Sequence, residues 1–216
     1  MIKLYGGPLS PFYNKVKIAL LEKGVKFEEI RMRPSQTPEL LDLSPMGKIP
    51  FVDINGHGLS ESTAIVEWLE DAYPTATLLP ATPNGRAHAR EAMLMLDLYL
   101  APAAAPFQRH RVFGDPLDDV ARNEARARIV RVLTALAHLV QYGPWLVGEQ
   151  FSFADLSAAA VLPMVQFAGN ELGEDLLATL PGIDEYLARL ATRESVRRTW
   201  ADRAAALAQM LEATEN

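Results

Sequence analysis

The sequence predicts an α/β part followed by an all-helical part, and three observations support this division. Up to Ala72, short β-capable runs alternate with stretches of helical periodicity. Beyond Gly85 the chain is rich in Ala, Leu and Arg and shows helical periodicity only. Between these parts, Pro74, Pro80 and Pro83 make a stiff connector. We therefore predict an α/β domain at 1–76, a linker at 77–84 and a helical domain at 85–216.

The first domain should begin with a strand at 2–5 and a helix that starts at Pro11. Gly6-Gly7-Pro8 ends the strand, Ser10 can cap the helix, and Lys23-Gly24 is typical of a helix C-terminus. The same signals predict further strands at 26–31, 51–54 and near Leu59, and a helix at 61–72. The order βαβ-α-ββα implies a parallel pair with a right-handed crossover, followed by an antiparallel hairpin.

In the second domain, Pro102 and Pro106 should bend or break the helix that starts near Arg86. A further helix is expected at 120–142, because apolar residues recur there at helical spacing. Ser152 and Asp155 form a capping box that opens the next helix. We interpret this box as structural and do not expect Asp155 to take part in catalysis.

Composition excludes several classes of function. The formal net charge of −6 argues against a nucleic-acid-binding protein, which usually presents a basic face. No apolar run is long enough to span a membrane, and the N-terminal residues read as a strand, so we expect a cytoplasmic protein. The absence of cysteine excludes disulfides and an enzyme thiol. The four histidines show no ligand spacing, and no metal site is predicted.

Three short motifs carry the functional signal, and Ser10 stands in the first of them, Ser10-Pro11-Phe12. Ser10 follows the first strand at a helix N-terminus, where backbone N–H groups and the helix dipole favour an anion. A ligand thiol placed there would be stabilised as its thiolate. From its position alone, a plain helix cap is the favoured reading of Ser10.

The first motif would bind the thiol of a small peptide, and the second and third motifs suit the backbone, the two carboxylates and the ammonium group of that peptide. In Gly47-Lys48-Ile49-Pro50, a cis bond before Pro50 would leave the Ile49 backbone open to pair with an extended ligand, and Lys48 would face a carboxylate. In Glu61-Ser62, Ser62 starts a helix and Glu61 can bind an ammonium group. Each motif alone also fits an ordinary turn or helix start.

Taken together, Tyr5-Gly6, Ser10-Pro11-Phe12, Lys48-Ile49-Pro50 and Glu61-Ser62 resemble the glutathione site of the soluble glutathione S-transferase family. The Ser152-to-Asp155 box resembles the capping motif of its second domain, so the resemblance covers nearly the whole chain. It implies a thioredoxin-like first domain, an all-helical second domain and a homodimer. It also implies glutathione as co-substrate, with no prosthetic group.

The resemblance assigns roles to individual residues. Ser10 would donate a hydrogen bond to the glutathione thiolate, with Tyr5 and Tyr13 as rival donors. The other expected glutathione contacts are Lys48, Ile49, Pro50, Glu61 and Ser62. The motif is most similar to serine-type classes, including tau-like ones. Those classes often carry Arg at the position of Lys15, which leaves the class of this chain open.

The resemblance implies an enzyme that activates the thiol for attack on a small apolar electrophile. The electrophile pocket is expected between the first helix and the bent helix of the second domain, lined by Leu9, Phe12, Tyr13, Tyr99, Pro102, Phe107 and Arg111. Interdomain packing is the alternative reading for Tyr99 and Phe107. The alternative functions are a catalytically silent binding or scaffold protein and a glutathione-dependent isomerase.

Overall fold

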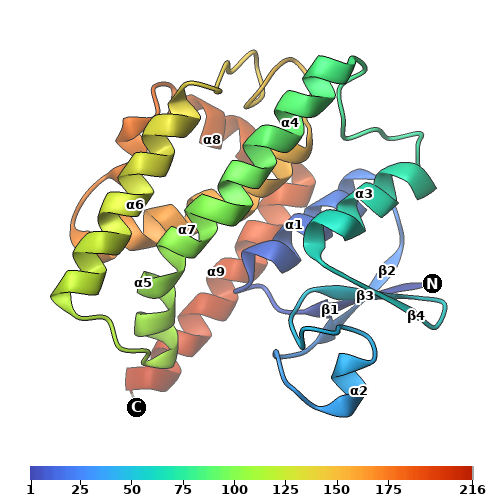
Figure 1. Cartoon of the computed structure of the whole chain (residues 1–216), viewed down its shortest axis with the longest axis horizontal. Coiled ribbons are helices and arrows are strands. Elements are labelled where there is room, and N and C mark those ends of the chain that lie inside the picture. Colours follow the sequence, from blue (N-terminus) through green and yellow to red (C-terminus); the bar gives the residue numbers. More distant parts are fainter. Residues whose placement is uncertain (216) are drawn as a thin grey trace.

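The first part of the chain is a four-stranded sheet with helices packed against it (Figure 1). The computed structural model describes residues 1–215. In the sheet order β2-β1-β3-β4, β1 and β2 are parallel, and β3 is antiparallel to both β1 and β4. The predicted α/β class, parallel pair and hairpin are thus confirmed. The elements are β1 (Ile2–Gly6), α1 (Pro11–Glu22), β2 (Phe27–Arg31), α2 (Pro38–Leu41), β3 (Phe51–Ile54), β4 (His57–Ser60) and α3 (Ser62–Ala72).

The second part is all-helical, as predicted, and α7 lies at its centre. Residues around the whole circumference of α7 are buried, because α1, α4 and α5 all pack against it. The predicted capping box opens this helix, and Asp155 Oδ2 accepts the Ser152 N–H at 2.9 Å. The helices are α4 (Pro83–Met95), η1 (Leu96–Leu100), α5 (Ala101–Phe113), α6 (Asp119–Ala137), α7 (Phe153–Leu172), η2 (Leu176–Thr179), α8 (Ile183–Thr192) and α9 (Glu194–Glu215).

The bend expected at Pro102 takes the form of a π-helical segment. The turn η1 joins α4 to α5, and Pro102 lies in the first turn of α5. Because proline has no N–H and its ring crowds the carbonyl four residues earlier, the regular ladder cannot run through this point. The wider π turn carries the chain past the proline. Pro106, by contrast, lies inside α5 without ending it.

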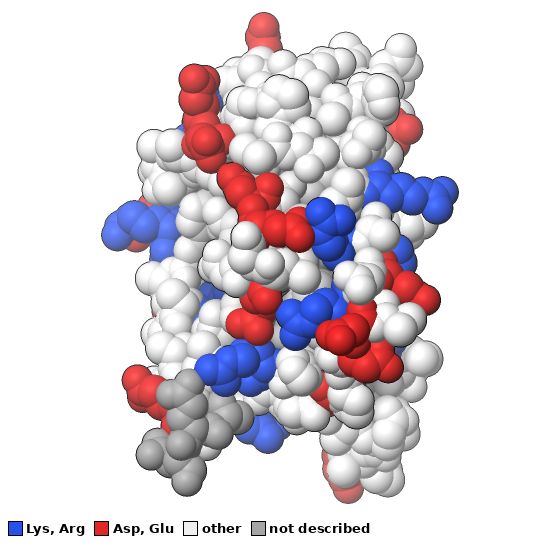
Figure 2. All heavy atoms as spheres, turned by 90° about the vertical axis from the view of Figure 1, so that its left-hand side faces the viewer, with Lys and Arg blue, Asp and Glu red and all other residues white. Residues whose placement is uncertain are grey.

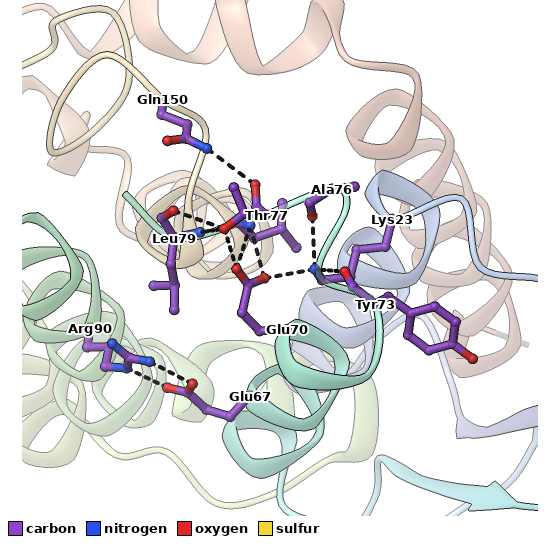
Figure 3. Close-up of polar contacts among 10 residues, drawn as sticks. Lys23, Glu67, Glu70, Tyr73, Ala76, Thr77, Leu79, Arg90 and Gln150 are labelled. Atoms are coloured by element: carbon purple, nitrogen blue, oxygen red, sulfur yellow. Dashed lines mark hydrogen bonds and ion pairs between the residues drawn. The ribbon is translucent and has the colours of Figure 1, made fainter. Parts of the chain in front are cut away.

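The segment between α3 and α4 is fastened to both parts of the molecule (Figure 3). Lys23, the C-cap residue of α1, donates to the carbonyls of Tyr73 and Ala76 at 3.0 and 2.9 Å and forms a 2.8 Å ion pair with Glu70 of α3. Glu70 also accepts the N–H of Leu78 at 3.0 Å. The Leu78 carbonyl in turn accepts the N–H of Phe153, 3.0 Å away in α7. These bonds attach the connector to α1, α3 and α7.

Acidic and basic side chains are interspersed on the face of the molecule that carries α6 (Figure 2). The ion pairs there include Arg126 with Glu174 at 2.7 Å. Such a mixed surface differs from the basic stripe that nucleic-acid binding requires. Within residues 1–215, none of the helices combines the length and the apolar character that a membrane span needs.

Candidate functional site

The three motifs meet at one end of the sheet. Tyr5, the penultimate residue of β1, is paired with Phe51, the first residue of β3, and Phe51 is paired with Ser60, the last residue of β4. The loop after β1, the cis Ile49–Pro50 bond before β3 and Glu61 after β4 therefore lie side by side. Segments from widely separated parts of the sequence thus form one candidate site.

Ser10 is the N-cap of α1, and its Oγ accepts the Tyr13 N–H at 3.3 Å. The side chain is half-buried. A hydroxyl has two acceptor lone pairs and one proton, so accepting at the helix end leaves the proton available for a ligand. The two readings of Ser10, as a cap and as a donor to a thiolate, are therefore compatible.

Side chains from two helices hold the loop that precedes Ser10. Asn14 of α1 donates to the Pro8 carbonyl at 2.9 Å, and Gln108 of α5 donates to the Leu9 carbonyl at 3.0 Å. Both side chains are buried. The backbone that carries Ser10 is thus fixed from both domains before any ligand binds, which favours a preorganised site.

The second motif presents the Ile49 backbone next to a cis peptide bond to Pro50. Gly47 has a φ of 62°, and a Cβ there would lie 2.1 Å from a backbone carbonyl oxygen, so only glycine fits. Lys48 is exposed and Ile49 half-buried. The cis bond expected from the sequence is present, and the ligand contacts of Ile49 and Lys48 stay a prediction.

The third motif combines an unusual backbone with an open helix end. Glu61 has a φ of 68° and a ψ of 109°, which is rare for a residue with a side chain and costs roughly 1–3 kcal/mol. Ser62 is the first residue of α3 and is largely buried. The Glu61 side chain does not cap the helix. The first N–H groups of α3 can therefore face an anion.

Lys15 lies behind this helix end and joins four elements. It is fully buried, pairs with Asp97 of η1, and donates to Thr63 of α3 at 3.1 Å. Asp97 also accepts a 2.8 Å hydrogen bond from Ser157 of α7. Burial lowers the pKa of Lys15, although Asp97 and then Glu61 act in the opposite direction. The cation thus ties α1 to the helix that carries Ser62.

Tyr13 does not occupy the position expected of it. Its side chain is fully buried, and its hydroxyl donates to Glu29 of β2 at 2.5 Å. Burial and the Glu29 carboxylate raise the pKa of Tyr13 far above its ordinary value. The residue therefore neither lines an open pocket nor offers its proton to a ligand. Tyr5, the other rival, is half-buried and stacks on Phe51 with ring centroids 4.5 Å apart.

The residues expected in the electrophile pocket are only partly accessible. Phe107 is buried among the helices, with the Arg122 guanidinium 5.8 Å from its ring centre, so it has the packing role. Leu9, Phe12 and Arg111 are half-buried, whereas Tyr99 and Pro102 are exposed. The Leu9 carbonyl accepts the hydrogen bond from Gln108 of α5, which ties this residue to the second domain.

Several residues near the loop were not anticipated from the sequence. Arg31, at the end of β2, lies over Gly7, 3.8 Å from where a Cβ of that glycine would stand. It borders a cavity of about 380 Å³ that is otherwise lined by α9. Arg203 of α9 donates to Gln108 at 2.8 Å. No local motif reveals these residues, because they meet through tertiary contacts only. Among the described residues, no cluster of three or more His, Cys, Asp or Glu could hold a metal.

Both parts of the chain match known protein families. Residues 4–77 match the family described as "Glutathione S-transferase, N-terminal domain", and residues 119–189 match "Glutathione S-transferase, C-terminal domain". A "Glutathione S-transferase" of Pseudomonas putida is 32% identical over 98% of this chain and 97% of its own length. A "Probable maleylacetoacetate isomerase" of Caenorhabditis elegans is 31% identical over 81% of this chain and 82% of its own.

Among solved structures, glutathione transferase F2 from Populus trichocarpa superposes with a TM-score of 0.81 over 95% of this chain and 100% of that one. The two sequences are 23% identical, so this likeness concerns the fold.

Proposed function

This chain belongs to the soluble glutathione S-transferase family, and on that premise we propose that it activates the glutathione thiol as a thiolate for attack on small electrophiles. Members of the family use glutathione as a co-substrate. The observation that carries the proposal is the meeting of the three motifs at one end of the sheet, with a serine whose proton is free to be donated.

In the proposed site, each motif binds one part of glutathione. The Ser10 hydroxyl donates to the cysteinyl sulfur, and the Ile49 backbone pairs with the cysteinyl amide as an added strand would. Lys48 faces the glycyl carboxylate. Ser62 and the first N–H groups of α3 bind the γ-glutamyl carboxylate, and Glu61 binds its ammonium group.

The chemistry requires only the thiolate and a carbon electrophile. The free thiol titrates near pKa 8.5, and each unit of lowering corresponds to about 1.4 kcal/mol of preferential thiolate stabilisation. The Ser10 hydrogen bond and the N-terminus of α1 act in this direction. The sulfur lone pair forms the new C–S bond, the electrophile releases its leaving group or takes up a proton, and a thioether results.

The test is a conjugation assay on the purified protein with glutathione and a panel of aryl halides, epoxides and activated alkenes. We expect accelerated formation of the thioether with at least one class, detected by mass spectrometry. A protein that binds glutathione but accelerates no conjugation would favour the binding or scaffold alternative.

Glutathione-dependent isomerisation is the second candidate, supported by the similarity to the isomerase of Caenorhabditis elegans. In that reaction the thiolate adds to an activated cis double bond and leaves after rotation, so glutathione is regenerated. Isomerisation of a cis-olefinic diacid with no net loss of glutathione would identify this activity. Ser10 would activate the same thiolate in both reactions.

A further inference from the structure

Arg203 is a buried cation on α9. The residue is only 6% exposed, and its guanidinium donates to the amide oxygen of Gln108 at 2.8 Å. Among the side chains that the structure describes, no carboxylate lies within ion-pair distance of it. A guanidinium withdrawn from water without a counterion is costly, and proteins normally pair such charges.

Arg203 is connected to the candidate site by two successive hydrogen bonds. Gln108 accepts from Arg203 through its amide oxygen and donates through its amide nitrogen to the Leu9 carbonyl at 3.0 Å. Leu9 directly precedes Ser10. Because a donor to the amide oxygen polarises the whole amide, the charge of Arg203 strengthens the Gln108 donor that holds the loop.

We propose that Arg203 is a positioning residue that stabilises the glutathione thiolate at Ser10, acting by its positive charge and through the Gln108–Leu9 connection. This inference rests on the function proposed above. The anion that the buried guanidinium lacks in the free protein is then supplied by the ionised ligand. Burial of Arg203 also lowers its own pKa, consistent with a cation that has no nearby carboxylate.

On the elements packed against α9, namely α1, α5 and α8, the other charged groups are engaged elsewhere or lie in solvent. On α1, the buried Lys15 and Lys17 both have carboxylate partners. On α5, the exposed Arg109 pairs with Asp115. Arg31 at the β2 end is exposed. The groups to consider in any pH profile are thus Lys15 with Asp97, Lys17 with Glu29 and Asp202, Arg109 and His110 with Asp115, Arg111, Arg31, Arg198, and the ligand contacts Lys48 and Glu61.

The experiment compares the thiol pKa of bound glutathione, from thiolate absorbance against pH, in the full-length wild type and in Arg203→Met. We expect the variant to raise the bound-thiol pKa by about half to one unit. Arg203→Lys keeps the charge and should stay within about 0.3 unit of the wild type. Arg197→Met removes an exposed charge from the same helix and should leave the pKa unchanged. Arg203→Gln replaces Arg203→Met if the methionine variant does not fold.

A second ligand separates charge from a merely structural role. S-methylglutathione keeps both carboxylates and the ammonium group of glutathione, but its thioether sulfur cannot ionise. At pH 8, Arg203→Met should raise the Kd for glutathione about three- to fivefold by linkage and that for S-methylglutathione less than about twofold. The midpoint of urea unfolding of the free protein should not fall, because the substitution removes a buried unpaired charge.

An unchanged bound-thiol pKa in the neutral variant that folds, or an equal loss of affinity for both ligands, would overturn the inference while the wild type still activates glutathione. A wild type that binds glutathione with its ordinary thiol pKa would overturn the proposed function as well.

Discussion

Ser10 combines a helix cap and a potential proton donor in one side chain. Its oxygen accepts the Tyr13 N–H at 3.3 Å, so capping the helix does not use the hydroxyl proton. Its loop is held by Asn14 and Gln108, so the hydroxyl does not have to be ordered when glutathione binds. A hydrogen bond made to a charged acceptor from a fixed donor contributes about 1.5–3 kcal/mol.

Ser10→Ala is therefore expected to lower turnover at least about tenfold, the scale of one lost hydrogen bond to a thiolate. Ser10→Thr retains both the hydroxyl and the capping oxygen and serves as the matched control. Steady-state rates with a reactive aryl halide provide the measurement. Equal rates for the alanine and threonine variants at the wild-type level would move the donor role to Tyr5 or to the N–H groups of α1.

At this scale the sequence identified the residues that act through local motifs. The cis Ile49–Pro50 bond and the Ser10 cap follow from short-range signals. The assignment of Tyr13 to the pocket was wrong, because its burial depends on Glu29 in the next strand. Gln108, 99 residues from Leu9, could not be identified, since no local pattern encodes such a contact.

At the scale of the elements, one carboxylate makes several of the bonds that hold the connector between α3 and α4. Glu70 is 7% exposed and binds Lys23, Thr77 and the Leu78 N–H. Burial alone would raise the pKa of Glu70, but the hydrogen bonds from these three partners outweigh it and hold the pKa below its ordinary value. Its contribution to stability is therefore present above the pKa of the unfolded state, about 4.5, and is lost as the pH falls through the lower folded pKa.

Glu70→Gln should accordingly lower the free energy of unfolding at pH 7 by roughly 2–4 kcal/mol, because Lys23 loses its buried partner. It should also flatten the decrease in stability below about pH 4.5. Urea denaturation across this pH range provides the measurement, with Glu28→Gln on the exposed side of β2 as control. A pH profile identical to that of the wild type would contradict this role for Glu70.

Element types were predictable because periodicity and breakers act within about ten residues. All four strands and the helices flanking them lie where the sequence placed them. The π-helical form of the bend before Pro102 was not predictable. It depends on how the α4–α5 pair packs against α7, and the local sequence specifies only that the regular ladder is interrupted.

For the whole molecule, we propose a homodimer that uses α4 and η1. Leu94 and Leu98 are 40% and 60% exposed and lie four residues apart, so they share one helix face. On the neighbouring helix α3, Ile65 and Leu69 are fully buried in the core and cannot contribute, whereas Trp68 is partly exposed.

Sedimentation velocity should show a dimer for the wild type and a shift toward monomer for Leu98→Glu, because a charge would be buried at the interface. Val120→Glu on α6, where the valine is 68% exposed, is the control and should leave the dimer intact. A wild type that remains monomeric at high protein concentration would contradict this arrangement.

The central claim is that the meeting of the three motifs at one end of the sheet creates a site that ionises glutathione. The direct test is the thiolate absorbance of glutathione bound to the wild-type protein, followed against pH. The account predicts a bound-thiol pKa about one to two units below the free value near 8.5. Binding with an unshifted pKa, or no binding at millimolar glutathione, would contradict it.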